Sequence, residues 1–188
     1  MLKDTRNMKT KDKLIIKNSK KKIMPLSQKE VEIIAWLEFY QKYFFTSKEI
    51  KQFFRDKSQR YNTIKNLLKK KRIIKINQDK YYLVPIKAKS GSWSEHPFVI
   101  IDEICNGENY YINGWASANY WRLTDQIPSA YDVYTTNRQG IKIILNTKMI
   151  FHRAKEINKS KIVIKKIKGH EFIIMNKKNS KKWMKSRE

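Results

Sequence analysis

The sequence predicts an α+β protein, and three observations support this fold class. Of its 188 residues, 40% are hydrophobic and 12% aromatic, enough to build packed cores. Apolar residues recur at helical spacing between residues 28 and 71, and short β-rich runs follow them. The longest apolar runs fall well short of the roughly 18 residues that a membrane span needs. We therefore expect a soluble chain of one or two small domains.

Three helices are predicted in the first part of the chain. Ser27 and Glu30 form the Ser-x-x-Glu pattern of a capping box ahead of an apolar segment over 28–43. A short second helix is expected over 48–54, capped by Thr46 or Ser47. The third helix is expected over 59–71, with Ser58 in position to cap it and an apolar stripe of Tyr61, Ile64, Leu67 and Leu68.

Two β-rich runs, 73–76 and 81–84, follow these helices. The four residues between them, Asn77 to Lys80, are typical of a hairpin turn, and Pro85 ends the second run. Three short helices followed by a hairpin form the plan of a winged helix-turn-helix, which we assign to residues 26–86. In that plan the third helix enters the major groove of DNA and the hairpin lies beside it.

The following region, residues 87–175, predicts a small mixed α+β domain. Helices are expected over 97–105 and 115–122, and a strand over 109–112. Further short strands are expected near 131–135, 141–145, 148–152, 161–167 and 170–175. The order and spacing of these helices and strands are too irregular for a repeat array.

The charge of the chain is large and unevenly distributed. The formal net charge is +25, from 42 Lys and Arg against 17 Asp and Glu, and self-repulsion of this size favours an anionic partner. Residues 86–154 carry seven basic and six acidic residues, so they are nearly neutral, whereas every flanking segment is strongly basic. We expect residues 1–25 to be a disordered basic arm and residues 176–188 a flexible basic tail. Double-stranded DNA is the expected partner.

The residue types on the third helix suit DNA recognition. Arg can bind guanine, and Asn or Gln can bind adenine, through paired hydrogen bonds, while Lys neutralises phosphates. Winged helices also bind proteins, but the clustering of basic residues on this helix and the hairpin favours DNA. The expected DNA-binding residues are Ser58, Gln59, Arg60, Asn62, Thr63, Lys65, Asn66, Lys69, Lys70, Lys75 and Lys80.

Several motifs of the second region are those of a known family. Tyr110–Ala118 reads Tyr-Tyr-Ile-Asn-Gly-Trp-Ala-Ser-Ala, and Leu123–Pro128 reads Leu-Thr-Asp-Gln-Ile-Pro. A Trp-x-Glu-x-Pro turn precedes them and a Val-x-Thr-Thr strand follows them. From about Leu26 to Met175 the chain resembles the AbiEi family, antitoxins and transcriptional regulators of type IV toxin–antitoxin systems.

This resemblance implies an autorepressor whose winged helix binds operator repeats as a homodimer or as paired monomers. It also implies that the second domain counteracts a nucleotidyltransferase toxin, with direct contact left open. The implied partner-facing residues are Trp93, Glu95, Ser117, Tyr120, Arg122, Thr124 and Gln126. Family members commonly continue with further helices where this chain ends in lysines, so retention of antitoxin activity is an open question.

Catalysis, cofactors and metals are not expected. The single cysteine, Cys105, excludes a disulfide framework, and His96, His152 and His170 lack metal-ligand spacing. No glycine-rich phosphate loop occurs. We expect a cytoplasmic DNA-binding regulator that is not an enzyme. The alternatives are an RNA- or protein-binding module without operator specificity and, third, a nuclease.

Overall fold

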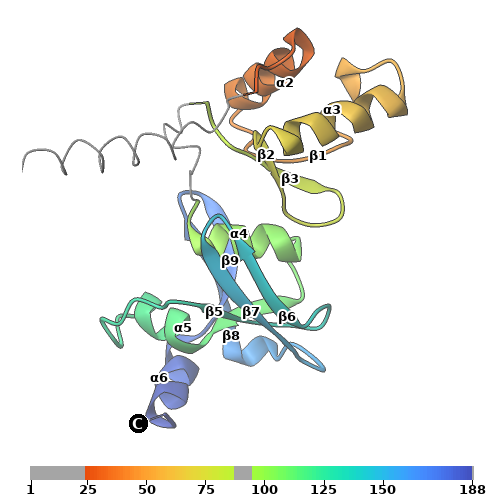
Figure 1. Ribbon diagram of the computed structural model, residues 1–188. Coiled ribbons are helices and arrows are strands. Elements are labelled where there is room, and N and C mark those ends of the chain that lie inside the picture. Colours follow the sequence, from red (N-terminus) through yellow and green to blue (C-terminus); the bar gives the residue numbers. More distant parts are fainter. Residues whose placement is uncertain (1–23, 87–94, 188) are drawn as a thin grey trace, which may run out of the picture.

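The structure is a computed structural model that describes residues 24–86 and 95–187 (Figure 1). The described residues form a mixed α+β fold with two sheets. The first sheet has three strands in the order β1-β3-β2, and the second has six in the order β6-β7-β5-β4-β9-β8. The α+β prediction is therefore confirmed.

The first sheet is built from short antiparallel strands and packs against two helices. Ile33, Ile34 and Leu37 of the first helix and Ile64 and Leu67 of the second are buried in one core with the strands. The elements are α2 (Gln28–Phe39), β1 (Phe44–Thr46), the 3-10 helix η1 (Lys51–Phe53), α3 (Lys57–Lys69), β2 (Ile73–Lys75) and β3 (Lys80–Leu83).

The segment between α2 and α3 differs from the prediction. The helix expected over 28–43 ends at Phe39, and the α-helix expected over 48–54 is a turn followed by η1. The Glu49 carboxylate accepts hydrogen bonds from the Thr46 backbone N–H at 2.7 Å and the Thr46 hydroxyl at 3.0 Å. These bonds close the turn that precedes η1. Strand β1, which pairs with β3, was not predicted from the sequence.

Helix α3 begins earlier than predicted and has a different cap. Its N-cap is Asp56, whose Oδ1 accepts from the Gln59 backbone N–H at 2.8 Å, so Ser58 is an exposed residue of the first turn rather than the cap. A carboxylate at this position also complements the positive end of the helix dipole, which a serine hydroxyl does not do.

The second sheet mixes parallel and antiparallel pairs. Strands β5 and β7 are parallel, as are β4 and β9, and the other neighbours are antiparallel. Every strand predicted after residue 109 is present. They are β4 (Tyr110–Asn113), β5 (Tyr131–Thr135), β6 (Gly140–Ile144), β7 (Thr147–Arg153), β8 (Ile162–Ile167) and β9 (His170–Met175).

Helix α4 (Pro97–Cys105) covers one face of the second sheet (Figure 1). His96 caps it by accepting from the Phe98 backbone N–H at 3.2 Å, and Pro97 occupies the first helical position. The predicted range 97–105 is confirmed. Phe98, Ile101 and Ile104 are buried against the strands.

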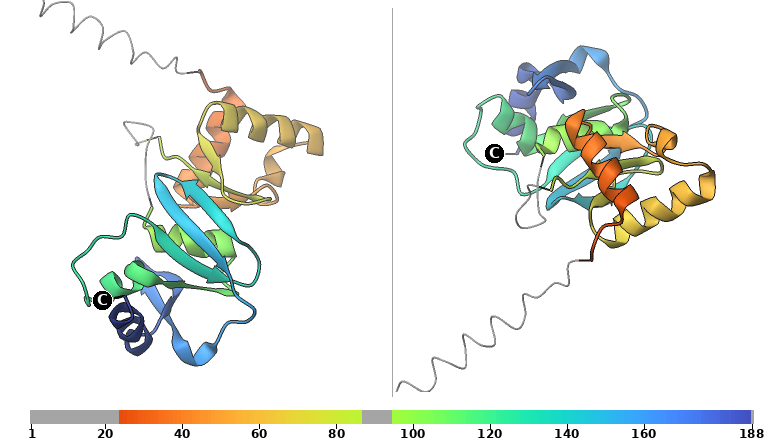
Figure 2. Two further views of the ribbon diagram at one scale, coloured as in Figure 1. Left: turned by 60° about the horizontal axis from the view of Figure 1, so that its bottom comes forward. Right: turned by 90° about the horizontal axis from the view of Figure 1, so that it is seen from above.

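The two sheets meet at the β2–β3 hairpin. Ile76, Tyr82 and Val84, from the hairpin and its end, are buried in the same core as α4 and the second sheet. This apolar contact places the first sheet beside α4. Figure 2 shows the arrangement of the elements from two further directions.

The last described residues fold, contrary to the prediction of a flexible tail. Helix α6 (Lys177–Lys185) packs on α5 (Gly114–Tyr120), which follows β4 directly. Buried Ser180 donates to the buried Ser117 hydroxyl at 3.1 Å, and the Trp183 and Trp115 rings meet edge to face. These tertiary contacts stabilise a lysine-rich segment whose sequence alone favours solvent.

Two other predictions concern the ends of the chain and the membrane. Residues 1–23 of the expected basic arm lie outside the described residues. Within the described ranges, no helix combines the length and the apolar character that crossing a membrane requires.

Candidate nucleic-acid interface

The outer face of α3 carries an exposed row of polar and basic side chains. Ser58, Asn62, Lys65 and Lys69 follow one another at spacings of three or four residues, so they share one side of the helix. All four are exposed, as are Gln59 and Asn66 beside them. Ile64 and Leu67 hold the opposite side in the core. Hydrogen-bonding groups thus project from a fixed helical frame.

A groove runs between α3 and the β2–β3 hairpin, with a volume of about 390 Å³. Three of the predicted DNA-binding residues, Arg60, Lys65 and Lys75, line this groove. Lys57 adds a fourth cation, whereas Asp79 is the one carboxylate among its lining residues. The surplus of positive charge makes the groove suitable for a phosphate-bearing ligand.

Lys57, Tyr61 and Gln78 line this groove but were not among the predicted DNA-binding residues. Tyr61 was predicted to lie in the core stripe of α3, but it is 65% exposed and lines the groove. Its assignment to the stripe is therefore wrong. Gln78, in the turn of the hairpin, also lines it. The signal for Tyr61 was available: the stripe of Ile64, Leu67 and Leu68 is complete without it.

The charge of Lys70 is paired within the fold. Its Nζ lies 2.5 Å from Oε2 of Glu30, a side chain that is 2% exposed. The same oxygen accepts from the Ser27 backbone N–H at 2.6 Å, which completes the predicted capping box of α2. Burial raises the pKa of Glu30, but the hydrogen bonds from Lys70 and Ser27 and the Lys70 charge outweigh it and hold the pKa below its usual range.

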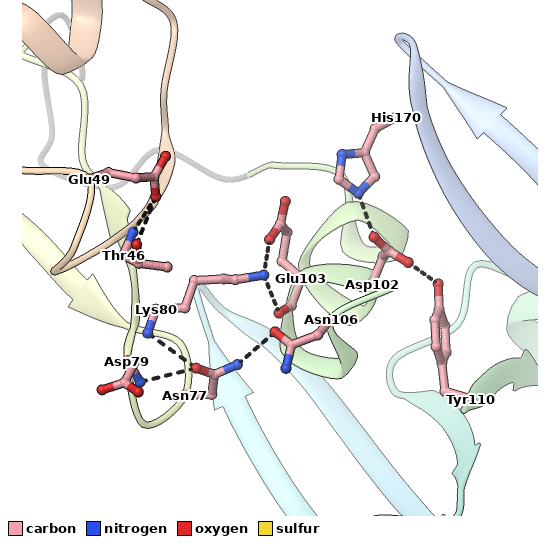
Figure 3. A network of polar contacts seen from close by, with 10 residues as sticks. All are labelled: Thr46, Glu49, Asn77, Asp79, Lys80, Asp102, Glu103, Asn106, Tyr110 and His170. Atoms are coloured by element: carbon pink, nitrogen blue, oxygen red, sulfur yellow. Dashed lines mark hydrogen bonds and ion pairs between the residues drawn. The ribbon is translucent and has the colours of Figure 1, made fainter. Parts of the chain in front are cut away.

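Lys80 is also paired within the fold (Figure 3). Its Nζ lies 2.7 Å from Oε2 of Glu103 on α4, and both side chains are largely buried. Asn77 donates to the Asn106 side chain at 3.3 Å, and Lys142 donates to the Ile76 carbonyl. These contacts fix the hairpin to α4 and β6. Lys70 and Lys80 are therefore half-buried, and their charges are already compensated within the fold.

The residues that the family resemblance implies for partner binding differ widely in exposure. Ser117 is fully buried, and its hydroxyl bonds to the Gly114 carbonyl and to Ser180, so a partner cannot reach it. Tyr120 packs against Phe98 and Phe172. Thr124 is half-buried and accepts from the Gln126 backbone N–H. Arg122 and Gln126 are exposed, Glu95 is half-buried, and Trp93 lies outside the described residues.

Both histidines of the second sheet, His152 and His170, pair with carboxylates within the fold. His170 and the Tyr110 hydroxyl contact the two oxygens of Asp102 at 2.8 and 2.7 Å, so that carboxylate has a partner on each side (Figure 3). His152 bonds to Asp132 at 2.7 Å and stacks on Tyr134. Burial raises the pKa of the Cys105 thiol to about 12, which keeps it protonated and unreactive.

No grouping of histidine, cysteine and acidic side chains suited to a metal occurs among residues 24–86 and 95–187. Comparison with known proteins adds no assignment: the chain matches no protein-family model and no curated protein.

Proposed function

We propose that this protein is a DNA-binding transcriptional regulator that resembles AbiEi antitoxins and represses its own operon. In this proposal residues 26–86 form a winged helix, with α3 as the recognition helix and the β2–β3 hairpin as the wing. The observation that carries it is the exposed polar row on α3 beside a groove lined by four cations and one carboxylate.

In this proposal the outer face of α3 recognises bases, and the groove binds phosphates. Asn62 and Asn66 on the outer face have the donor and acceptor pair that adenine recognition needs. Lys57, Arg60 and Lys75 in the groove then follow the phosphates of the strand that passes between helix and wing. The exposed ring of Tyr61 contacts the same DNA strand. Lys70 and Lys80 keep the frame of this surface in position.

Binding measurements with two duplexes test the proposal. Fluorescence anisotropy should show the chain preferring its own promoter over a random duplex by orders of magnitude at physiological salt. Asn62→Ala should reduce that preference about tenfold, since one paired contact with a base contributes about 1–3 kcal/mol of discrimination. Lys75→Ala should weaken both duplexes alike and lower the slope of log K against log salt by about 0.9.

Lys148→Ala is the matched control, because Lys148 is an exposed lysine on β7 of the second sheet. It should leave the promoter preference unchanged. Equal affinity of the unmodified chain for promoter and random duplex would exclude the repressor function. Metal-dependent cleavage of either probe would instead support the nuclease alternative.

The antitoxin function rests on the family resemblance alone. If it is retained, co-expression of the chain should restore growth to cells that express a nucleotidyltransferase encoded beside it. Because Ser117 is buried and Tyr120 is half-buried, the exposed Arg122 and Gln126 are the residues of the implied set to test first. If growth stays arrested, the antitoxin function is excluded, and the repressor function is unaffected by this result.

A further inference from the structure

A second cationic surface lies on α6 and on the short 3-10 helix η2 (Lys159–Lys161). We call it the α6 surface, and all of its members are exposed. None of them forms an ion pair with a described carboxylate, and Glu171, the one acidic residue between 157 and 187, pairs with Lys166. The α6 surface consists of Lys159, Lys161, Lys177, Lys178, Lys181, Lys182, Lys185 and Arg187.

The fold holds this surface in a fixed shape. Asn176 caps α6, and its backbone N–H and side-chain amide donate to the carbonyls of Lys161 and Ser160 in η2 at 2.9 and 3.0 Å. Ser180 and Trp183 attach the other side of the helix to α5. The lysines therefore project from an anchored helix of about 13 Å, given a rise of about 1.5 Å per residue.

The arrangement is electrostatically unfavourable without a counter-charge. Lys177 and Lys181, Lys181 and Lys185, and Lys178 and Lys182 are like-charged pairs four residues apart on one helix. Lys177 and Lys178 also lie at the N-terminal end, where the helix dipole disfavours cations. A polyanion bound along α6 would remove both penalties, whereas monovalent ions only screen them.

We propose that the α6 surface binds the phosphate backbone of duplex DNA without reading its sequence. Seven of its eight members are lysines, which bind phosphates as point charges, whereas Trp183, the aromatic residue of α6, is turned onto Trp115. The surface thus lacks the stacking side chains that single strands use. A rigid helix with regularly spaced cations matches the regular phosphates of a duplex.

The location of α6 suits it to bind a segment of duplex other than the one bound by α3. In Figures 1 and 2, α3 and α6 lie at opposite ends of the described fold. We therefore assign to α6 a neighbouring or second segment of duplex, away from the base pairs that α3 reads. This role rests on the proposed function, but backbone binding by α6 itself does not require α3 to recognise an operator.

The test neutralises α6 without removing its helix. Lys178→Gln, Lys181→Gln and Lys185→Gln are combined, since glutamine has nearly the helix propensity of lysine. The control combines Lys148→Gln, Lys155→Gln and Lys168→Gln, which remove the same charge from exposed sites elsewhere. Affinity for a random duplex is measured from low to physiological salt, and circular dichroism checks that both proteins are folded.

The α6 variant should lower the salt slope by about 2–3 and weaken binding at low salt at least tenfold, with the promoter preference unchanged. Equal slopes for variant and control would overturn the proposal. Loss of binding to a single strand of equal length with the duplex unaffected would also overturn it. Should the triple variant fail to fold, Lys181→Gln alone is used, and its slope should fall by about 0.9. Asn62→Ala reports on α3 separately, so the two proposals fail independently.

Discussion

At the scale of single residues, the charge of Lys70 is used inside the fold. Glu30 is buried, and one of its carboxylate oxygens, Oε1, has no hydrogen-bond partner among the described residues. The ion pair with Lys70 is therefore the main compensation for burying this carboxylate. Removing one member of such a pair leaves an unpaired buried charge, which costs far more than the loss of a surface ion pair.

We predict that Lys70→Met lowers the free energy of unfolding by about 3 kcal/mol at neutral pH. The lowered pKa of Glu30 gives stability that is present above its unfolded pKa and lost as pH falls through the folded value. Without Lys70, burial raises that pKa, so acid relieves the defect by protonating Glu30. Urea unfolding from pH 7 to pH 3 should therefore show the gap to the unmodified protein shrinking. Lys69→Met is the exposed control, and a gap that stays constant with pH would contradict this mechanism.

Local patterns could be predicted at this scale, and distant partners could not. The capping box of Ser27 and Glu30 is correct because both members lie within one turn of sequence. The partners of Lys70 and Lys80 lie 40 and 23 positions away, and no local pattern distinguishes these lysines from exposed ones. The ion pairs of these two lysines could therefore not be predicted from sequence.

At the scale of elements, the strands of the second sheet were predictable and α6 was not. Apolar runs bounded by turn residues define β5 to β9 locally. Their order in the sheet, with β5 beside β7 and β4 beside β9, depends on contacts between distant segments. The α6 sequence offers one tryptophan and many lysines, so its helix depends on docking against α5, where Ser180 is fully buried.

We therefore expect Trp183→Ala to unfold α6 locally while the sheets remain intact. The change removes the edge-to-face contact with Trp115 at a ring-centre distance of 5.3 Å, and like-charge repulsion then favours the extended chain. Hydrogen exchange should show amides of residues 177–185 losing protection, with those of β4 and β9 unchanged. Lys181→Ala should have the opposite effect and slow exchange, because it removes a repulsive charge. Unchanged protection in Trp183→Ala would mean that the Ser180 contacts suffice.

At the scale of the whole molecule, the β2–β3 hairpin belongs to two units. It pairs within the first sheet, yet its residues Ile76 and Tyr82 are buried in the core of the second. Lys80 and Glu103 form the ion pair across this contact. The position of the proposed wing is thus set by α4, so changes at the second sheet can alter how α3 and the hairpin fit a duplex.

Lys80→Gln distinguishes this structural function from direct phosphate binding. If Lys80 serves only the contact with α4, the substitution should lower stability by about 1–3 kcal/mol, since it leaves the largely buried Glu103 without its cation. The salt slope of DNA binding should stay within error of the unmodified protein, whereas a lost phosphate contact would lower it by about 0.9. Glu103→Gln completes a double-mutant cycle, in which the two changes should be strongly non-additive. Additive effects, or a reduced salt slope in Lys80→Gln alone, would indicate that Lys80 contacts DNA directly.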